Sequence, residues 1–376
     1  MRIAKNKTLI ARGKIKIEGN AEVLGAKKNE FSTEKFIPIY FLDDSEVKIN
    51  GDYFVVDGCT IPESWKKLVK LDWETLFIYG GTDRGKSTLA AYLANKLDGC
   101  WILDLDVGQA DVAHPAAMGY GFAKNVISIS EVKMQNGFFV GSISPMGRES
   151  KCLRGVVKLW KELSKLEGRK IVDTTGWIKG KRAREYKLAK LEIINPDIVA
   201  SFEGKPEYLS DYKLFEVESQ NLIIRSREER ARIRAANYAK WLKGSKKISP
   251  DNFELISGKA ISKEFIQDLI SAEVEFVKKS DEYIAICTKK QAEIDPEIIK
   301  GLKELYGVEE VFIFAKDELK GIICGLYKKD RYLGMGMLSM LDGKYVIETQ
   351  FDDFDRIEVG EVRFDGEKEY ILRLPL

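Results

Sequence analysis

The sequence has few of the residues on which several kinds of active site depend. Its 376 residues include a single histidine, His114, which argues against a Ser-His-Asp triad and against a metal site built from several histidines. The five cysteines are scattered and form no CxxC pair, which argues against a zinc site or a disulfide framework. Unpaired cysteines are typical of a reducing compartment, so we expect a cytoplasmic protein.

Long hydrophobic runs are also absent. No stretch approaches the roughly 18 consecutive apolar residues of a membrane-spanning helix, and the first residues hold no apolar core of a secretory signal. We therefore expect no membrane association. Hydrophobic residues make up 44% of the chain, which is enough for a globular core. The length predicts about two to three domains.

Acidic and basic residues nearly balance over the whole chain, with a net charge of +2, but they are unevenly distributed. Residues 76–245 carry an excess of lysine and arginine, whereas residues 246–376 carry an excess of aspartate and glutamate. A basic middle part favours a polyanionic partner such as a nucleic acid, the alternative being local scatter of charge.

Strand and turn patterns divide the chain into three predicted domains. Residues 1–65 contain short apolar runs separated by turn residues, which is typical of a small antiparallel β domain. In residues 66–248, strand-like and helix-like segments alternate, which predicts an α/β fold with a doubly wound parallel sheet. The strands expected there are 76–79, 101–105, 138–140, 169–173, 198–201 and 222–224. Residues 249–376 contain a helix-like segment at 261–279 and then strand-like runs, which predict a β-containing C-terminal domain.

A glycine-rich segment between a strand-like run and a helix-like segment matches the pattern G-x-x-x-x-G-K-[ST]. Such glycines let backbone N–H groups turn toward phosphate oxygens, and the following helix adds the positive end of its dipole. In this pattern Lys86 reaches the β- and γ-phosphates and the Ser87 hydroxyl binds Mg²⁺. The segment, a phosphate-binding loop (P-loop), predicts a nucleoside triphosphate site and makes residues 66–248 an expected P-loop NTPase domain. Its residues are Gly80, Gly81, Thr82, Asp83, Arg84, Gly85, Lys86 and Ser87, followed by Thr88.

Acidic residues end two of the later strand-like runs. Asp104 and Asp106 follow one run, with Gln109 close behind, and Asp173 follows another. The carboxyl ends of neighbouring strands open on one crevice in such sheets, so we expect both to contribute. One carboxylate would hold Mg²⁺, for which we expect Asp104, and another would orient the attacking hydroxyl. The pattern leaves open which of Asp104 and Asp106 has which role.

Arginines crowd the start of a helix-like segment near residue 225. Arg230 and Arg234 stand four residues apart and share one face of that helix. Arginine pairs of this kind close over a triphosphate and neutralise charge in the transition state. We expect this pair to form a lid, the alternative being a solvated helix face.

Together these motifs resemble the polynucleotide 5′-hydroxyl kinases related to the kinase subunit of the eukaryotic pre-mRNA cleavage factor. The resemblance is specific over residues 61–245, and at both ends of the chain it rests on architecture alone. The matching segments are residues 61–65 (IPESW), 80–88 (GGTDRGKST), 104–109 (DLDVGQ), 141–145 (GSISP), 174–180 (TTGWIKG), 195–197 (NPD) and the arginine-rich helix.

The resemblance implies roles for individual residues. Asp106 matches the carboxylate that activates the 5′-hydroxyl, and Gln109 lies on the substrate side of the same motif. Arg230 and Arg234 are similar to the lid arginines of the family, with one residue fewer between them.

Two further positions follow from the same resemblance. Trp177 matches an aromatic residue that stacks on a terminal base of the substrate, and Ser144 lies in a loop that can contact Mg²⁺. The family often has two hydroxyl residues before the proline of that loop, whereas here Ile143 precedes Ser144. Basic residues follow Trp177, and we expect them on the nucleic-acid surface. They are Lys179, Lys181, Arg182, Arg184, Lys187 and Lys190.

We therefore expect a Mg²⁺-dependent kinase that transfers the γ-phosphoryl group of ATP, or another NTP, to the 5′-hydroxyl end of a polynucleotide, with RNA favoured over DNA. A non-catalytic ATP-binding scaffold of an RNA-processing complex is one alternative, against which the intact Asp106 and lid arginines argue. A nucleotide-switch GTPase is another, against which the lack of an N-K-x-D motif argues. Protein partners stay open.

Overall fold

The computed structural model describes residues 1–220, 225–250, 255–341 and 344–374. Its contacts divide the chain into two compact units, Met1–Ile233 and Arg234–Leu376, and the boundary falls inside helix α5 (Arg227–Leu242). The predicted division into three domains stays a prediction. The strand predicted at 222–224 lies outside the described residues.

An antiparallel sheet of six strands forms the N-terminal part of the first unit. Its path is β1-β5-β2-β4-β3, and β6 pairs with β2. Apolar side chains alternate along the long strands and gather on one side as a separate core. The antiparallel pairing predicted for this part is therefore present. The strands are β1 (Arg2–Ile3), β2 (Lys7–Glu18), β3 (Ala21–Val23), β4 (Glu30–Phe41), β5 (Ser45–Asn50) and β6 (Tyr53–Asp57).

The second sheet of the first unit has seven strands in the order β10-β9-β8-β11-β7-β12-β13. Strands β8, β11, β7, β12 and β13 are parallel, whereas β9 and β10 are antiparallel additions at one edge. Every residue of β7 is buried, as expected of a central strand covered on both faces. The strands are β7 (Thr75–Tyr79), β8 (Cys100–Leu105), β9 (Ala117–Ala123), β10 (Asn136–Phe139), β11 (Lys170–Thr174), β12 (Ile198–Ser201) and β13 (Leu214–Glu216).

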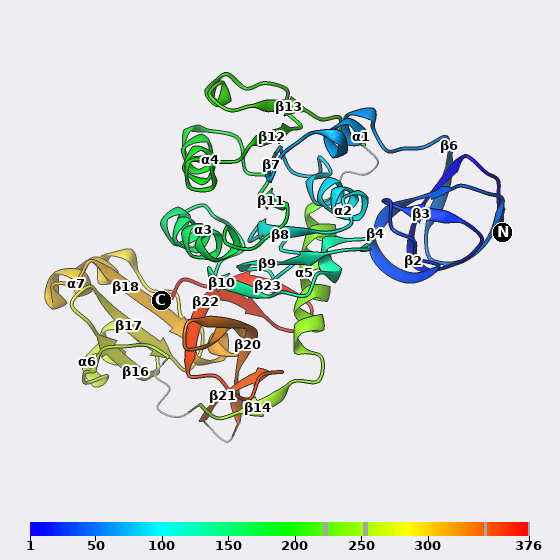
Figure 1. The fold of residues 1–376 in the computed structure, drawn as a ribbon. Helices are drawn as coiled ribbons and strands as arrows, with labels where there is room; N and C mark the ends of the chain where they lie inside the picture. Colours follow the sequence, from blue (N-terminus) through cyan, green and yellow to red (C-terminus); the bar gives the residue numbers. More distant parts are fainter. Residues whose placement is uncertain (221–224, 251–254, 342–343, 375–376) are drawn as a thin grey trace. The chain divides into compact units, whose positions relative to one another are not determined.

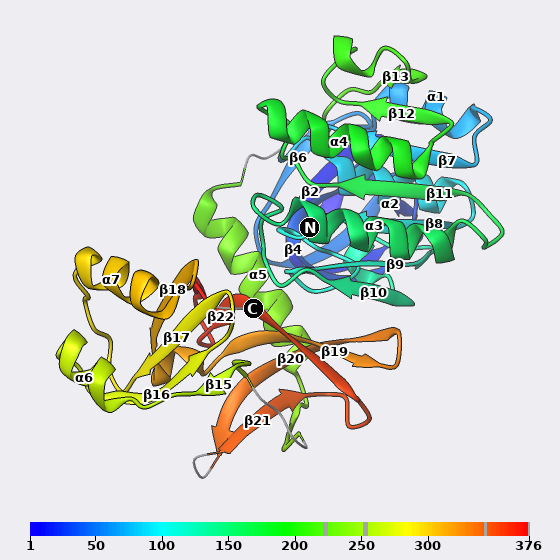
Figure 2. The same ribbon diagram turned by 90° about the vertical axis from the view of Figure 1, so that its left-hand side faces the viewer.

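Helices cover both faces of this sheet, which makes it an α/β structure. Figure 1 shows the sheet edge-on, with α3 and α4 on one side and α1 and α2 on the other. In Figure 2, α3 and α4 lie in front of the strands. Two apolar cores result, one under each helical layer. The helices are α1 (Glu63–Lys70), α2 (Lys86–Lys96), α3 (Glu149–Leu163) and α4 (Lys181–Ile194), with short 3₁₀ turns at Ile129–Glu131 and Glu207–Leu209.

The second unit contains two further sheets. One has six antiparallel strands in the order β14-β21-β20-β19-β22-β23, and the other has four strands in the order β15-β16-β17-β18. The strands are β14 (Lys246–Ile248), β15 (Lys259–Ala260), β16 (Val274–Lys279), β17 (Tyr283–Thr288), β18 (Glu310–Ala315), β19 (Ile322–Lys328), β20 (Arg331–Leu341), β21 (Lys344–Thr349), β22 (Arg356–Phe364) and β23 (Glu369–Ile371). The helices are α6 (Glu264–Ile270) and α7 (Pro296–Tyr306), with a 3₁₀ turn at Lys316–Leu319.

The prediction of one helix over 261–279 is wrong. Helix α6 ends at Ile270, Ser271 adopts a left-handed conformation with φ of +52°, and the chain then continues as β16. Val274 and Val277 face the core from this strand, so a β-branched run was assigned to the wrong element. Among the described residues, no helix is long and apolar enough to cross a membrane.

Candidate active site

The P-loop and the predicted acidic residues lie at the carboxyl ends of three parallel strands. The P-loop follows β7, Asp106 follows β8, and the residues after Asp173 leave β11. Asp173 and Asp104 are direct partners in the β8–β11 ladder. This edge is where ligands bind in open α/β sheets.

The P-loop turns tightly between β7 and α2. Gly85 caps α2 with φ of +97°, a conformation in which a side chain would be strained. The N-terminus of α2 therefore faces the loop, as an anion site requires. The buried Lys86 Nζ donates to Gly81 O at 2.7 Å, so the lysine folds across the loop.

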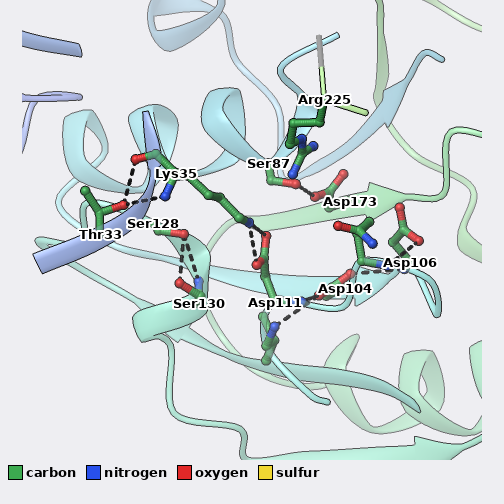
Figure 3. Close-up of polar contacts among 12 residues, drawn as sticks. Thr33, Lys35, Ser87, Asp104, Asp106, Asp111, Ser128, Ser130, Asp173 and Arg225 are labelled. Carbon is green, nitrogen blue, oxygen red and sulfur yellow. Dashed lines mark hydrogen bonds and ion pairs between the residues drawn. The ribbon is translucent and has the colours of Figure 1, made fainter. Parts of the chain in front are cut away.

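Ser87 and Asp173 form the pair that a P-loop enzyme uses for a divalent cation. Ser87 Oγ donates to Asp173 Oδ2 at 2.6 Å (Figure 3). Burial raises the pKa of Asp173, while the charge of Lys86 and the Ser87 hydrogen bond oppose this rise. A serine hydroxyl beside a strand-end carboxylate is the protein half of such a magnesium site, so these residues fit Mg²⁺.

Asp104 has a different setting from Asp173. Its Oδ2 accepts the N–H groups of Asp111 at 2.6 Å and Val112 at 3.0 Å, and its Oδ1 accepts Asp106 N–H at 3.0 Å. Burial, followed by the charges of nearby carboxylates, raises the pKa of Asp104 well above its usual value. Through these hydrogen bonds Asp104 holds together the loop that follows β8. Its role as a metal ligand stays a prediction.

Asp106 is only half-buried and lines the pocket together with Lys86. Its Oδ1 accepts the N–H groups of Gly108 at 3.0 Å and Gln109 at 3.1 Å, and these bonds fix its direction. The Oε1 atom of Gln109 is buried and has no hydrogen-bond partner among the described residues. The loop thus offers a carboxylate and a free amide acceptor to a ligand.

The N-terminal sheet contributes to the same pocket. Lys35 Nζ, from β4, donates to both carboxylate oxygens of Asp111, at 2.7 and 2.8 Å (Figure 3). Arg12, Phe36 and Pro38 also line the pocket from this sheet. The position of these residues in the site was missed, because nothing local in the first 60 residues signals it.

Two arginines bind the P-loop itself. Arg225 Nη2 contacts Asp83 Oδ1 at 2.6 Å, and Arg230 Nη1 donates to Asp83 Oδ2 at 3.0 Å. Both arginines neutralise this carboxylate, which would otherwise face a phosphate site. Arg225 was missed as a candidate, although it opens the same arginine-rich segment.

Arg234 is bonded elsewhere, within the second unit. Its guanidinium donates through Nε and Nη2 to the carboxylate of Glu369 on β23. Both side chains are largely buried. The side chain of Arg234 is thus bonded within the second unit, and the pairing of Arg230 with Arg234 as a lid stays a prediction.

Trp177 and Ser144 lie on loops at this end of the sheet. The Trp177 ring is half-buried and packs against Tyr186 with ring centroids 5.8 Å apart. Ser144 Oγ accepts Met146 N–H at 3.2 Å, which is a local turn contact. Substrate stacking by Trp177 and metal contact by Ser144 stay predictions.

One expectation about the basic run after Trp177 is wrong. Lys187 and Lys190 have 0% exposure and point into the core from α4, so they cannot belong to a nucleic-acid surface. Arg182 Nη2 donates a hydrogen bond to Glu149 Oε1 at 2.6 Å. In a helix, successive side chains point in different directions, so part of a basic run on α4 faces the core.

Comparisons with known proteins bear on the resemblance that the sequence predicts. Residues 80–244 match the family described as mRNA cleavage and polyadenylation factor CLP1 P-loop, which confirms the predicted resemblance. The polyribonucleotide 5′-hydroxyl-kinase of Methanocaldococcus jannaschii is 28% identical over 344 residues, 84% of this chain and 91% of that protein. That of Pyrococcus furiosus is 33% identical over 185 residues, 46% of this chain and 52% of that protein.

A solved structure shares the fold. The structure of a wild-type Clp1p–Pcf11p complex aligns with a TM-score of 0.61 at 13% identity, covering 96% of this chain and 97% of that one.

Proposed function

We propose that this chain, which matches the CLP1 P-loop family over residues 80–244, is a kinase that phosphorylates the 5′-hydroxyl end of a polynucleotide, with RNA as the favoured acceptor. A nucleoside triphosphate, ATP or another NTP, is the phosphoryl donor. The observation that carries this proposal is a single pocket lined by the P-loop, by Asp106 and by Gln109. A passive nucleotide holder needs no group for an attacking hydroxyl, whereas a kinase does.

The donor side rests on the P-loop and the arginines that contact it. The backbone N–H groups of the loop and the N-terminus of α2 would hold the phosphates, and Lys86 would leave Gly81 O to bind them. Arg225 and Arg230 already stand at the loop through Asp83, so they would stabilise charge on the transferring group.

Magnesium belongs to this proposal as a bound cofactor. Ser87 and Asp173 would hold it, and when bound it neutralises the charge of the β- and γ-phosphates. Asp104 would stabilise the conformation of the loop after β8, since its oxygens accept three backbone N–H groups there.

The acceptor side rests on Asp106, Gln109 and Trp177. Asp106 would accept a hydrogen bond from the 5′-hydroxyl and orient the oxygen toward the γ-phosphorus, and positioning of this kind supplies most of the rate enhancement in phosphoryl transfer. Gln109 Oε1 would accept from the substrate, and Trp177 would stack on its terminal base. The doubly wound arrangement, the three-domain layout and a cytoplasmic location remain predictions.

Transfer of labelled phosphate tests the function directly. The protein is incubated with Mg²⁺, γ-labelled ATP and 5′-hydroxyl RNA or DNA oligonucleotides, single- and double-stranded, and the same oligonucleotides carrying a 5′-phosphate serve as controls. We expect label only on the 5′-hydroxyl ends, and no label after Lys86→Ala. ATP binding without transfer to any of these acceptors would instead indicate a non-catalytic scaffold, and preferential GTP hydrolysis would indicate a switch protein.

A further inference from the structure

Helix α4 contains a lysine whose place in the core the proposed function does not explain. Lys187 is completely buried, and a buried ammonium group is costly unless it is bonded. Its Nζ donates to Thr174 Oγ1 at 2.8 Å and to Thr175 O at 2.5 Å. Both acceptors lie where the chain leaves β11, in residues 174–176, of which Thr174 is the last strand residue. The two hydrogen bonds of Lys187 therefore hold this turn.

The same turn contacts the donor site on its other side. Thr174 Oγ1 donates to Ile78 O at 3.0 Å, on the strand that leads into the P-loop. Gly176 lies directly against Thr82 of the P-loop, because a Cβ atom on Gly176 would be 2.4 Å from Thr82 Oγ1 and 2.5 Å from Thr82 N. A displacement of the turn would therefore displace the P-loop.

Both ends of the turn carry groups of the proposed mechanism. Asp173 stands immediately before it, and its Oδ1 accepts Thr174 N–H at 2.8 Å while its Oδ2 accepts from Ser87. Trp177 stands immediately after it. We propose that Lys187 is a positioning residue which, by bonding both threonines of this turn, fixes the donor groups and the acceptor platform relative to each other; this rests on the proposed kinase function.

A second lysine on the same helix provides a matched control. Lys190 is as deeply buried as Lys187, but its Nζ has no hydrogen-bond partner among the described residues. It lies 4.1 Å from the centre of the Tyr186 ring. Either change to methionine removes a fully buried lysine amine, whereas of the two lysines Lys187 is the one that hydrogen-bonds the turn.

The test compares Lys187→Met with Lys190→Met in the full chain. For each variant we would measure the melting temperature, kcat for a 5′-hydroxyl oligonucleotide and the affinity for a fluorescent ATP analogue. We expect Lys187→Met to lose about 10- to 100-fold in kcat and to bind the analogue more weakly, because small displacements at a reacting centre have effects of this size. Lys190→Met is expected to keep kcat within about threefold and to bind the analogue like the wild type.

Three results would overturn the proposal. Equal kcat losses in the two lysine variants would mean that Lys187 acts only through charge or packing. If Lys187→Met does not fold, Thr174→Val replaces it, since this change removes one of the two acceptors, and an unchanged kcat would contradict the proposal. If the wild type transfers no phosphate at all, the kinase function fails, and Lys187 is then judged on analogue affinity alone: equal affinities in both variants would refute it.

Discussion

At the scale of the residue, two aspartates two positions apart have opposite surroundings, which favour different roles for them. Asp104 is almost fully buried, and three backbone N–H groups occupy its oxygens. Asp106 is half-buried, and only its Oδ1 is held, by the N–H groups of Gly108 and Gln109. The first carboxylate builds the loop and the second is directed into the pocket.

We predict that Asp106→Asn lowers kcat for phosphoryl transfer by about 10²-fold or more, because the group that orients the hydroxyl loses its charge. The affinity for ATP should change little, since the donor site does not depend on Asp106. A steady-state assay beside an ATP titration measures both.

Asp104→Asn is the matched change. It replaces one acceptor oxygen by an N–H₂ group, so a backbone N–H of the loop loses its partner inside the protein. We therefore expect a lower melting temperature before any specific loss of transfer. If Asp104→Asn abolished transfer with the melting temperature intact while Asp106→Asn stayed active, the two roles would be reversed.

At the scale of the element, α5 and the segment before it show what the sequence could reveal. The P-loop, the strand ends and the α/β fold follow from local patterns, because strand, glycine turn and helix are contiguous. Arg230 was predicted and contacts the P-loop, but the contact of Arg225 with the same loop was not predicted. Helical spacing shows which residues share a face and does not show what that face contacts. Arg225 and Arg230 have one residue more between them than Arg230 and Arg234.

Other parts of the site were unpredictable for a related reason. The pairing of Lys35 with Asp111 joins residues 76 positions apart, and no local pattern records it. The inward direction of Lys187 depends on how α4 packs, which charge alone does not give. Long-range contacts of this kind decide which charged residues face solvent.

The arginines give a prediction for α5 and the segment before it. Arg225→Met should lower kcat at least about tenfold, toward the roughly 10³-fold that arginines at phosphoryl-transfer sites contribute. Arg234→Met should instead lower the melting temperature with little change in kcat, because it leaves the largely buried Glu369 unpaired. If Arg234→Met lost turnover like Arg225→Met at an unchanged melting temperature, the lid would be the pair Arg230 and Arg234.

At the scale of the whole molecule, the pocket of the first unit is assembled from segments far apart in the sequence. The N-terminal sheet supplies Lys35, the strand ends supply Asp106 and Asp111, and the segment before α5 supplies Arg225. The N-terminal sheet therefore belongs to the site rather than standing apart from it, because Lys35 neutralises a nearly buried carboxylate on the loop that carries Asp106.

This arrangement predicts that a change in the N-terminal sheet affects both stability and turnover. Lys35→Met leaves the nearly buried carboxyl group of Asp111 without its ion-pair partner, and about 1–3 kcal/mol of destabilisation is expected for an unsatisfied group of this kind. Because Asp111 N–H donates to Asp104, the loop should loosen and kcat should fall as well. Lys96→Met, which breaks the more exposed Lys96–Glu22 pair, is the control and should cost less than about 1 kcal/mol. Urea denaturation beside the kinase assay measures both effects, and equal behaviour of the two variants would show that the N-terminal sheet does not support the catalytic loop.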